Sequence, residues 1–224
     1  MAAAVKRSYN SSRRREQTAA TRRHVVEVSR SFFLTDGYVA TSMRDVADTA
    51  GVSLQTLYNM FRSKFGLFSA LMDVVVAGDH ERVSVTERPN VVALDQIADP
   101  KKYVAGLVDV AVPVLNRLNA IYPVLQAAAA SDAEVARAYR TFAIDARFAP
   151  YLAAGERLAG MNALVAGLDA SKAADILWTV LSPDAFHLLV DEREWTADDF
   201  QHWATTTLVA TLVTRPRRRA AGQG

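Results

Sequence analysis

The sequence predicts an all-α fold. Apolar residues recur at three- and four-residue steps through most of the 224 residues, which is the period of an amphipathic helix. Glycines, prolines and Ser, Thr or Asp caps divide this pattern into lengths typical of helices. No alternating apolar segment is bounded by turn pairs, so we expect no sheet.

Composition indicates a folded protein without disulfides. Hydrophobic residues make up 50% of the chain and charged residues 22%, and there is no cysteine, which excludes disulfides and cysteine–metal sites. No apolar run approaches the roughly 18 residues of a membrane helix, and no apolar segment follows the N-terminal arginines as in a secretory signal. We therefore expect a cytoplasmic location.

Charge is distributed unevenly along the chain. Residues 1–23 hold seven basic residues and one acid, and residues 215–224 hold four arginines and no acid, while residues 24–214 carry a net charge of −8. A basic arm beside a folded domain is typical of contact with a polyanion, although a solubilising tail has the same composition.

Four helices are expected in the first third of the chain. Residues 1–16 lack apolar periodicity and are expected to form a flexible arm. A helix then runs from Gln17 to Asp36-Gly37, where glycine can adopt the left-handed conformation that ends a helix. Three further helices are expected to follow a cap at Thr41 or Ser42, a cap at Ser53 and a cap at Ser63, and the last of them runs from Lys64 to about Ala77.

The second and third of these helices have the form of a helix-turn-helix. They contain about eight and six residues and are separated by a short turn at Gly51. In this motif the second helix lies in the major groove of DNA, with its N-terminal residues at the base edges.

The rest of the chain is expected to form a helical bundle. Residues 78–99 are punctuated by Gly78, Pro89 and Asn90 and mark a joint, and residues 100–214 are helical throughout. Helix starts are indicated by Asp99-Pro100, Ser131 with Glu134, Ser171, and Thr196 with Asp199. Breaks or kinks are indicated by Pro113, Pro150 and Pro183.

The stretch from Phe33 to Leu71, FLTDGYVATSMRDVADTAGVSLQTLYNMFRSKFGLFSAL, resembles the TetR family of bacterial regulators. It has the Gly-Tyr, the Ala-Thr-Ser cap, the Asp-Val-Ala, the Ala-Gly-Val-Ser, the Thr-Leu-Tyr and the Ser-Lys in order and at the family's spacing. It departs from the family at Phe65, where glutamate is frequent, at Leu54, and at Met60, where histidine is frequent.

The resemblance implies an all-α fold with an N-terminal three-helix helix-turn-helix DNA-binding domain, followed by a helical-bundle effector and dimerisation domain. The predicted organisation is a flexible basic arm at 1–16, the DNA-binding domain at 17–77, the ligand-binding and dimerisation domain at 78–214, and a basic disordered tail at 215–224. It implies a homodimer on a pseudo-palindromic operator in double-stranded DNA and an unidentified small-molecule effector.

Base contacts are expected from Gln55, Thr56 and Asn59. Gln and Asn can form paired hydrogen bonds with adenine, and a threonine methyl can touch thymine. Asn59 is equally consistent with a residue that ends the helix and with a base contact. Arg44 is equally consistent with an ion pair to Asp48 and with a phosphate contact. Ser42, Tyr58 and Lys64 are expected to hold phosphates, the first and last of them because they stand at helix N-termini. Arg13, Arg14 and Arg15 are expected to reach an adjacent minor groove or the backbone. The remaining predicted contacts with DNA are Thr41, Ser53 and Leu54.

The effector pocket is expected inside the bundle, because such pockets are mostly apolar with a few polar groups. Arg147 there would need an anionic partner if buried, or would pair with Asp145 or Glu156 at the surface. Each candidate is equally consistent with plain core. The candidates are Tyr103, Leu107, Val110, Tyr122, Leu125, Tyr139, Phe142, Arg147 and Trp178.

Dimerisation is expected on the last two helices. The candidate apolar residues are Leu181, Phe186, Trp203, Leu208 and Leu212, of which some must be intramolecular core. Neither His202 beside Asp198 and Asp199 nor any other histidine has the spacing of a metal site, so no metal and no cofactor are expected.

An enzyme and an architectural protein are two other classes of function for an all-helical chain. The chain has no Glu-x-x-His, Gly-x-Ser-x-Gly, HExxH or phosphate-binding glycine loop, so we expect no enzyme. A helical architectural or partner-binding protein with non-specific DNA contact is the alternative. A repressor released from its operator by a small molecule is the favoured function.

Overall fold

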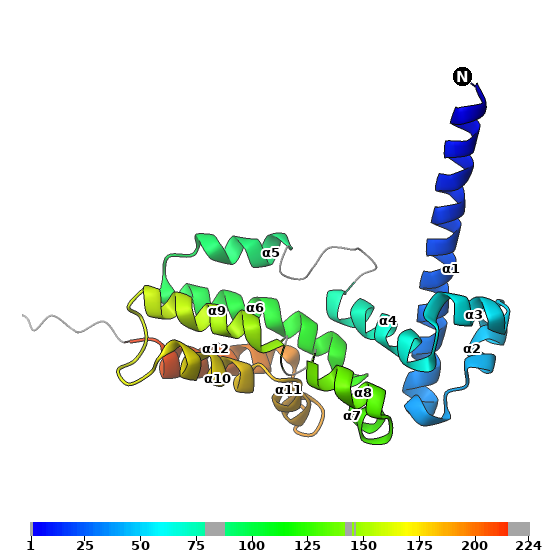
Figure 1. Cartoon of the computed structure of the whole chain (residues 1–224). Helices are drawn as coiled ribbons and strands as arrows, with labels where there is room; N and C mark the ends of the chain where they lie inside the picture. The colour runs from blue at the N-terminus through cyan, green and yellow to red at the C-terminus, as the bar shows by residue number, and fades with distance from the viewer. Residues whose placement is uncertain (1, 79–87, 142–144, 146, 215–224) are drawn as a thin grey trace, which may run out of the picture. The chain divides into compact units, whose positions relative to one another are not determined.

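The computed structural model describes residues 2–78, 88–141, 145 and 147–214, with the backbone alone over residues 2–15. Over this part of the chain it is all-helical, as predicted, with one isolated bridge between Leu164 and Val213 and no strand (Figure 1). The helices are α1 (Ala2–Ala40), α2 (Met43–Thr49), α3 (Leu54–Phe61), α4 (Lys64–Ala77), α5 (Pro89–Val92), the 3₁₀ helix η2 (Ala93–Gln96), α6 (Pro100–Asn119), α7 (Tyr122–Ser131), α8 (Ala133–Tyr139), α9 (Arg147–Gly160), α10 (Ala170–Val180), α11 (Pro183–Val190) and α12 (Ala197–Leu212).

Packing divides the chain into two units. The N-terminal unit comprises Met1–Arg82 with Ala120–Arg137, and the C-terminal unit comprises Val83–Asn119 with Ala138–Gly224. The segment that holds α7 was predicted to belong to the C-terminal bundle, but it packs against α1. The domain limits 17–77 and 78–214 remain predictions.

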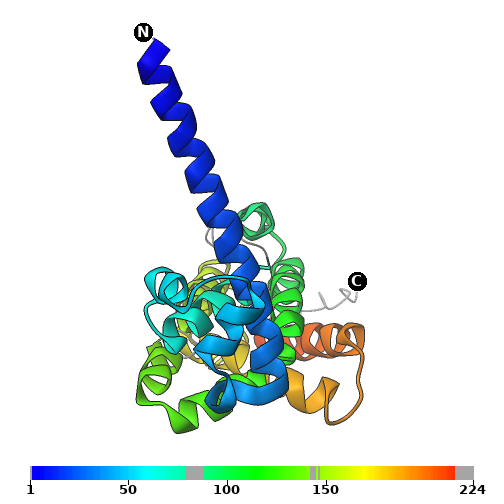
Figure 2. The ribbon, with the colours of Figure 1, turned by 90° about the vertical axis from the view of Figure 1, so that its right-hand side faces the viewer.

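Helix α1 is longer than predicted. The arm expected at 1–16 is drawn as the first turns of the helix, which extends beyond α2, α3 and α4 (Figure 2). No glycine or proline occurs before Gly37, and alanine and arginine favour helix, so nothing in the sequence ends the helix earlier. Gly37, with φ of 76° and ψ of 173°, interrupts the helical backbone where the sequence predicted the stop. The tail at 215–224 lies outside the described residues.

Serine caps fix the starts of α2, α3 and α4, and these three predictions are confirmed. The hydroxyls of Ser42, Ser53 and Ser63 accept hydrogen bonds from the amides of Arg44, Thr56 and Gly66. Gly51, with φ of 66°, makes the turn between α2 and α3, and Gly78 ends α4 in the left-handed conformation.

An aromatic cluster forms the centre of the N-terminal unit. The ring centroid of Phe68 lies 5.0 Å from that of Phe33 and 5.2 Å from that of Tyr38, both edge to face. All three side chains are buried, as are Leu57 of α3 and Leu71 of α4. The helix-turn-helix is thus held on α1 and α4 by a packed core.

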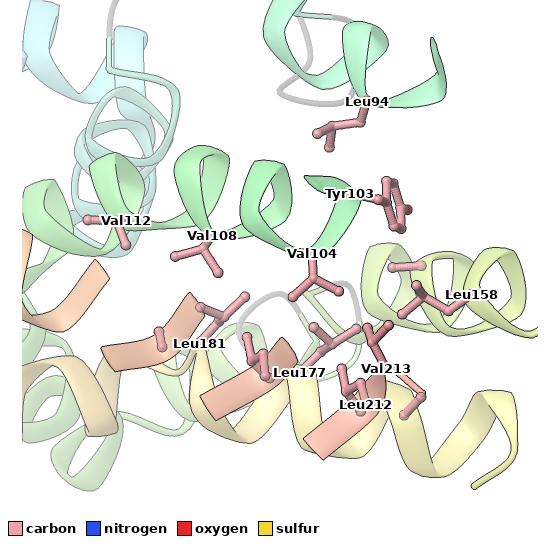
Figure 3. Close-up of a cluster of buried hydrophobic side chains, with 14 of the residues drawn as sticks. Leu94, Tyr103, Val104, Val108, Val112, Leu158, Leu177, Leu181, Leu212 and Val213 are labelled. Carbon is pink, nitrogen blue, oxygen red and sulfur yellow. The ribbon is translucent and has the colours of Figure 1, made fainter. Parts of the chain in front are cut away.

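The C-terminal unit has its own apolar core between α6, α9, α10, α11 and α12. Figure 3 shows Val104 and Val108 of α6 facing Leu177 of α10 and Leu181, which follows the last residue of α10. Leu94 of η2 covers α6 from the other side. The approach is close, because a Cβ on Gly106 would lie 2.6 Å from a methyl carbon of Leu94.

Two predicted caps differ in the structure. Asp132, not Ser131, caps α8, since its carboxylate accepts from the amides of Glu134 and Val135. The hydroxyl of Ser131 instead donates to Ala127 and Ala128 of α7. Asp169, not Ser171, caps α10. In each case a carboxylate stands within two residues of the serine and accepts the amide hydrogens.

One helical stretch, Ala170–Val190, is long and apolar enough to span a membrane by length and composition, whereas the sequence predicted no such segment. Helices α6 and α7 together also meet this criterion as a bent pair. The stretch is interrupted at Ser182, whose hydroxyl accepts from the amide of Ala185. Leu177, Leu181 and Phe186 within it are fully buried in the core of the C-terminal unit. A core helix passes the same test of composition.

Candidate DNA-binding surface

Helix α3 has one buried face and one polar face. Leu57 and Phe61 are buried, as expected for core residues. Gln55, Thr56 and Asn59 are exposed, and Tyr58 keeps 42% of its surface exposed. The helix continues to Phe61, so Asn59 lies within it rather than at its end. The geometry therefore leaves the predicted base-reading side chains accessible together.

Hydrogen bonds order this polar face. The Gln55 amide nitrogen donates to the Asn59 amide oxygen at 3.0 Å, one turn along. The Ser53 hydroxyl accepts from the Thr56 amide at 3.0 Å and lies 2.7 Å from the Thr56 hydroxyl. The Thr56 hydroxyl is thereby engaged with the cap, which leaves its methyl group as the part suited to an apolar contact.

Lys64 supports the link that leads into α2. Its ammonium donates to the carbonyl of Val39 at 2.9 Å and to that of Thr41 at 3.3 Å, and it lies 4.8 Å from the centroid of the Tyr38 ring. An ammonium has three N–H donors, so one is left for a phosphate. The predicted phosphate contact thus coexists with a structural role that the sequence did not indicate.

The other predicted contacts before α2 differ in access. Thr41 is buried, and its hydroxyl donates to the Gly37 carbonyl at 2.7 Å, so this hydroxyl serves the fold. Ser42 is half-buried at the start of α2, and Arg44 is exposed. Among the described side chains, no ion pair joins Arg44 to Asp48. Leu54 is half-buried in the first turn of α3.

Arg22 holds the far end of α3, a role that sequence reasoning missed. Its guanidinium donates to the carbonyl of Met60 at 2.8 Å and lies 4.3 Å from the centroid of the Phe61 ring. A cation at a helix C-terminus is favoured by the helix dipole. From the sequence alone, Arg22 is only one of the seven basic residues of 1–23. Arg13, Arg14 and Arg15 lie on α1, and their contact with DNA remains a prediction.

The predicted effector residues are divided between the two units, and their role in binding a ligand remains a prediction. Tyr122 and Leu125 lie on α7 in the N-terminal unit, whereas Tyr103, Leu107 and Val110 lie on α6 in the C-terminal unit. Tyr103 is buried, and the Arg157 guanidinium lies 4.6 Å from the centroid of its ring. Burial raises the pKa of the Tyr103 hydroxyl. The C-terminal unit also contains Tyr139, which is half-buried, whereas Phe142 lies outside the described residues.

Arg147 binds the end of α10 through main-chain carbonyls. It donates to Leu181 at 3.1 Å and to Trp178 at 3.4 Å, and its guanidinium lies 4.8 Å from the centroid of the Trp178 ring. These carbonyls lie at a helix C-terminus and carry partial negative charge, which suits a guanidinium. The indole N–H of Trp178 is buried without a hydrogen-bond partner. Burial raises the pKa of the neighbouring Tyr151 hydroxyl.

Most of the predicted dimer residues are core residues of the chain itself. Leu181, Phe186, Leu208 and Leu212 are fully buried within the C-terminal unit, and only Trp203 is half-buried. The most exposed large apolar side chain of α11 is Leu188, at 58%. Periodicity identified the inward face of α11 and α12, because intramolecular core and dimer contacts are both apolar.

Asp199, near His202, takes part in the helix cap with Thr196, as the sequence predicted. Asp199 accepts from the amide and hydroxyl of Thr196 at 3.0 Å and 2.6 Å, and these bonds hold its pKa below the usual range. In the described part of the chain, no group of three His, Asp or Glu side chains is placed to hold a metal ion.

Comparison with known proteins identifies the N-terminal part. Residues 25–71 match the family model described as bacterial regulatory proteins, tetR family. No curated protein matches the chain.

Solved structures share the fold over most of the chain. A protein described as a transcriptional regulator from Saccharomonospora viridis, in complex with choline, has a TM-score of 0.66 at 18% identity and covers 87% of this chain and 98% of its own. NalD, the secondary repressor of the MexAB-OprM multidrug efflux pump in Pseudomonas aeruginosa, has a TM-score of 0.64 at 20% identity. The match covers 88% of this chain and 98% of NalD. A protein described as a fatty acid metabolism regulator from Clostridium perfringens has a TM-score of 0.63 at 17% identity. The match covers 86% of this chain and 100% of that protein.

Proposed function

Through residues 25–71 the chain belongs to the bacterial regulatory proteins of the tetR family, and we propose that it is a sequence-specific transcriptional repressor released from its operator by a small molecule. The exposed polar face of α3 is the observation that supports this most. Gln55, Thr56 and Asn59 are exposed on this face, while the opposite face of α3 is buried in the core of the helix-turn-helix. A helix with exposed side-chain amides on one face suits readout of base edges in the major groove. No enzymatic activity belongs to the proposal.

The proposed active form is a homodimer in the cytoplasm. Two recognition helices roughly 34–36 Å apart would read successive major grooves of a pseudo-palindromic operator. The outer faces of α11 and α12 are the proposed interface, with Leu188 and Trp203 as their accessible apolar side chains. The basic residues Arg13, Arg14 and Arg15 on α1 would reach an adjacent minor groove or the phosphate backbone.

The way the chain connects the units supports release by a ligand. The chain passes between the two units at 82–83, 119–120 and 137–138, so a change in α6 or α9 reaches the DNA-binding helices by covalent paths through α7 as well as through α4. The neighbour bound to choline supports a small-molecule effector in a protein of this fold. Such a ligand acts by binding better to the conformer whose recognition helices do not fit DNA.

Selection of binding sites from random duplex DNA tests the proposal. We expect enrichment of a pseudo-palindrome bound by a dimer. Removal of residues 1–16 should weaken binding and flatten its dependence on salt, because fewer counterions are released. Salt-sensitive binding without any enriched sequence would instead favour the architectural alternative.

A further inference from the structure

Gln55 and Asn59 stand one turn apart on the exposed face of α3 and are joined by a hydrogen bond. The Gln55 amide nitrogen donates to the Asn59 amide oxygen at 3.0 Å. Both side chains are exposed, so the bond forms on the face that meets DNA rather than in the core. The two amides are therefore aligned before any DNA is present.

The bond divides the hydrogen-bonding groups of the pair. A primary amide has one acceptor oxygen and two N–H donors. Gln55 uses one N–H on Asn59 and keeps its oxygen and the second N–H, which is the donor–acceptor pair that matches N7 and the N6 amino group of adenine. Asn59 has its oxygen engaged and keeps two N–H donors, which match the acceptors O6 and N7 of guanine or O4 of thymine.

Helix geometry sets the spacing of the bases. Residues four apart in a helix are separated by about 6 Å along its axis. Base pairs are stacked about 3.4 Å apart, so the two amides address base pairs one or two steps apart. The Thr56 methyl lies between them in sequence and suits the methyl group of a thymine.

We propose that Gln55 and Asn59 act as one reading unit, in which Asn59 orients Gln55 for an adenine and presents its own N–H donors to a guanine or thymine one or two base pairs away. The proposal rests on the proposed function of α3 as the recognition helix. Asn59 is thus a positioning residue for the base pair of Gln55 and a specificity residue for its own.

Two substitutions of Asn59 separate these roles. Asn59→Ala removes the acceptor that holds Gln55, whereas Asn59→Asp keeps an acceptor at the same place and removes only the N–H donors. Each protein is used at full length to select sites from random duplex DNA, and preference is read as the ratio between bases at one position. In Asn59→Asp the added carboxylate repels the phosphates of every DNA sequence alike. This repulsion therefore cancels in the ratio between bases.

Asn59→Ala is expected to lower the preference for adenine at the Gln55 position by about tenfold, a typical loss for one well-oriented amide contact. Asn59→Asp should keep that preference within about twofold of wild type and shift the second position toward cytosine or adenine, whose amino groups donate. In a Gln55→Ala background, Asn59→Ala should have no further effect at the Gln55 position.

The opposite results would overturn the pairing. An adenine preference unchanged in Asn59→Ala, or equal losses in Asn59→Ala and Asn59→Asp, would show that Asn59 does not orient Gln55. These outcomes differ from failure of the proposed function, in which the wild-type protein itself enriches no sequence. Circular dichroism of each variant checks that α3 remains folded, so that a loss of preference reports recognition.

Discussion

The Tyr38 hydroxyl donates a hydrogen bond to the Asp132 carboxylate at 3.1 Å, joining residues 94 positions apart. Tyr38 follows the break in α1, and Asp132 caps α8 through the amides of Glu134 and Val135. Burial, the hydrogen bond and the negative charge of Asp132 raise the pKa of Tyr38, so the hydroxyl remains a donor at neutral pH. This hydrogen bond connects α1, which packs with the helix-turn-helix, to the residue between α7 and α8.

Tyr38→Phe removes this hydrogen bond and leaves the ring among Phe33 and Phe68. The free energy of unfolding should fall by about 1 kcal/mol, a usual value for a partly exposed hydrogen bond. Urea denaturation measures the change. In an Asp132→Ala background the same substitution should have little further effect, and an equal loss in both backgrounds would show that the two residues are not coupled.

Asp132 should make stability sensitive to acid. Its hydrogen bonds from the amides of Val135 and Glu134 hold its pKa below the usual value. A carboxyl with a lowered folded pKa contributes stability above its unfolded pKa, about 3.9, and the contribution is lost as pH falls through the folded pKa.

Asp132→Asn keeps a capping oxygen but cannot titrate. The variant should therefore lose less stability than wild type between pH 7 and pH 3, as measured by urea denaturation at each pH. The same acid-induced loss in both proteins would contradict the assignment to Asp132.

Arg22 and Arg23 offer a matched pair for the role of the arginine at the end of α3. Both are exposed, but Arg22 donates to the Met60 carbonyl and stacks on Phe61. Arg22→Ala should lower the free energy of unfolding by about 1–2 kcal/mol, because it removes a hydrogen bond from a charged group and a cation–π contact. Arg23→Ala removes the same charge and should cost less than about 0.5 kcal/mol. Equal costs would show that the contact with Met60 contributes nothing.

Gly155 allows α9 and α10 to approach closely. A Cβ at this position would lie 2.2 Å from the carbonyl oxygen of Ala170, a backbone atom that cannot move aside without shifting α10. Gly155→Ala should destabilise the protein by about 1–3 kcal/mol through overpacking. Gly160 at the end of the same helix has no atom within 4 Å of such a Cβ, so Gly160→Ala is the control. Thermal unfolding of the two variants compares them, and similar midpoints would contradict the close approach.

Local signals allowed much of the fold to be predicted. Ser42, Ser53, Ser63 and Thr196 were identified as caps because the bonds that they accept lie within three residues of each in sequence. Where two caps competed, as at Ser131 and Asp132, the sequence did not show which residue would bind the amides.

Contacts between distant residues were not predictable in the same way. The packing of α7 with α1, the bond between Tyr38 and Asp132 and the contact of Arg22 with Met60 depend on the tertiary fold. Apolar periodicity also identified Leu208 and Leu212 as dimer candidates, although both are fully buried inside the chain. Periodicity shows which face of a helix is apolar but not what covers it.

The central claim is that α3 reads DNA sequence. The most direct measurement is fluorescence anisotropy of a selected duplex and of its scrambled version, titrated with wild-type protein and with Gln55→Ala at two salt concentrations. We predict that Gln55→Ala weakens binding to the selected duplex by about 1–3 kcal/mol and leaves binding to the scrambled duplex nearly unchanged. Equal losses on both duplexes, or equal wild-type affinity for the two, would contradict sequence recognition by α3.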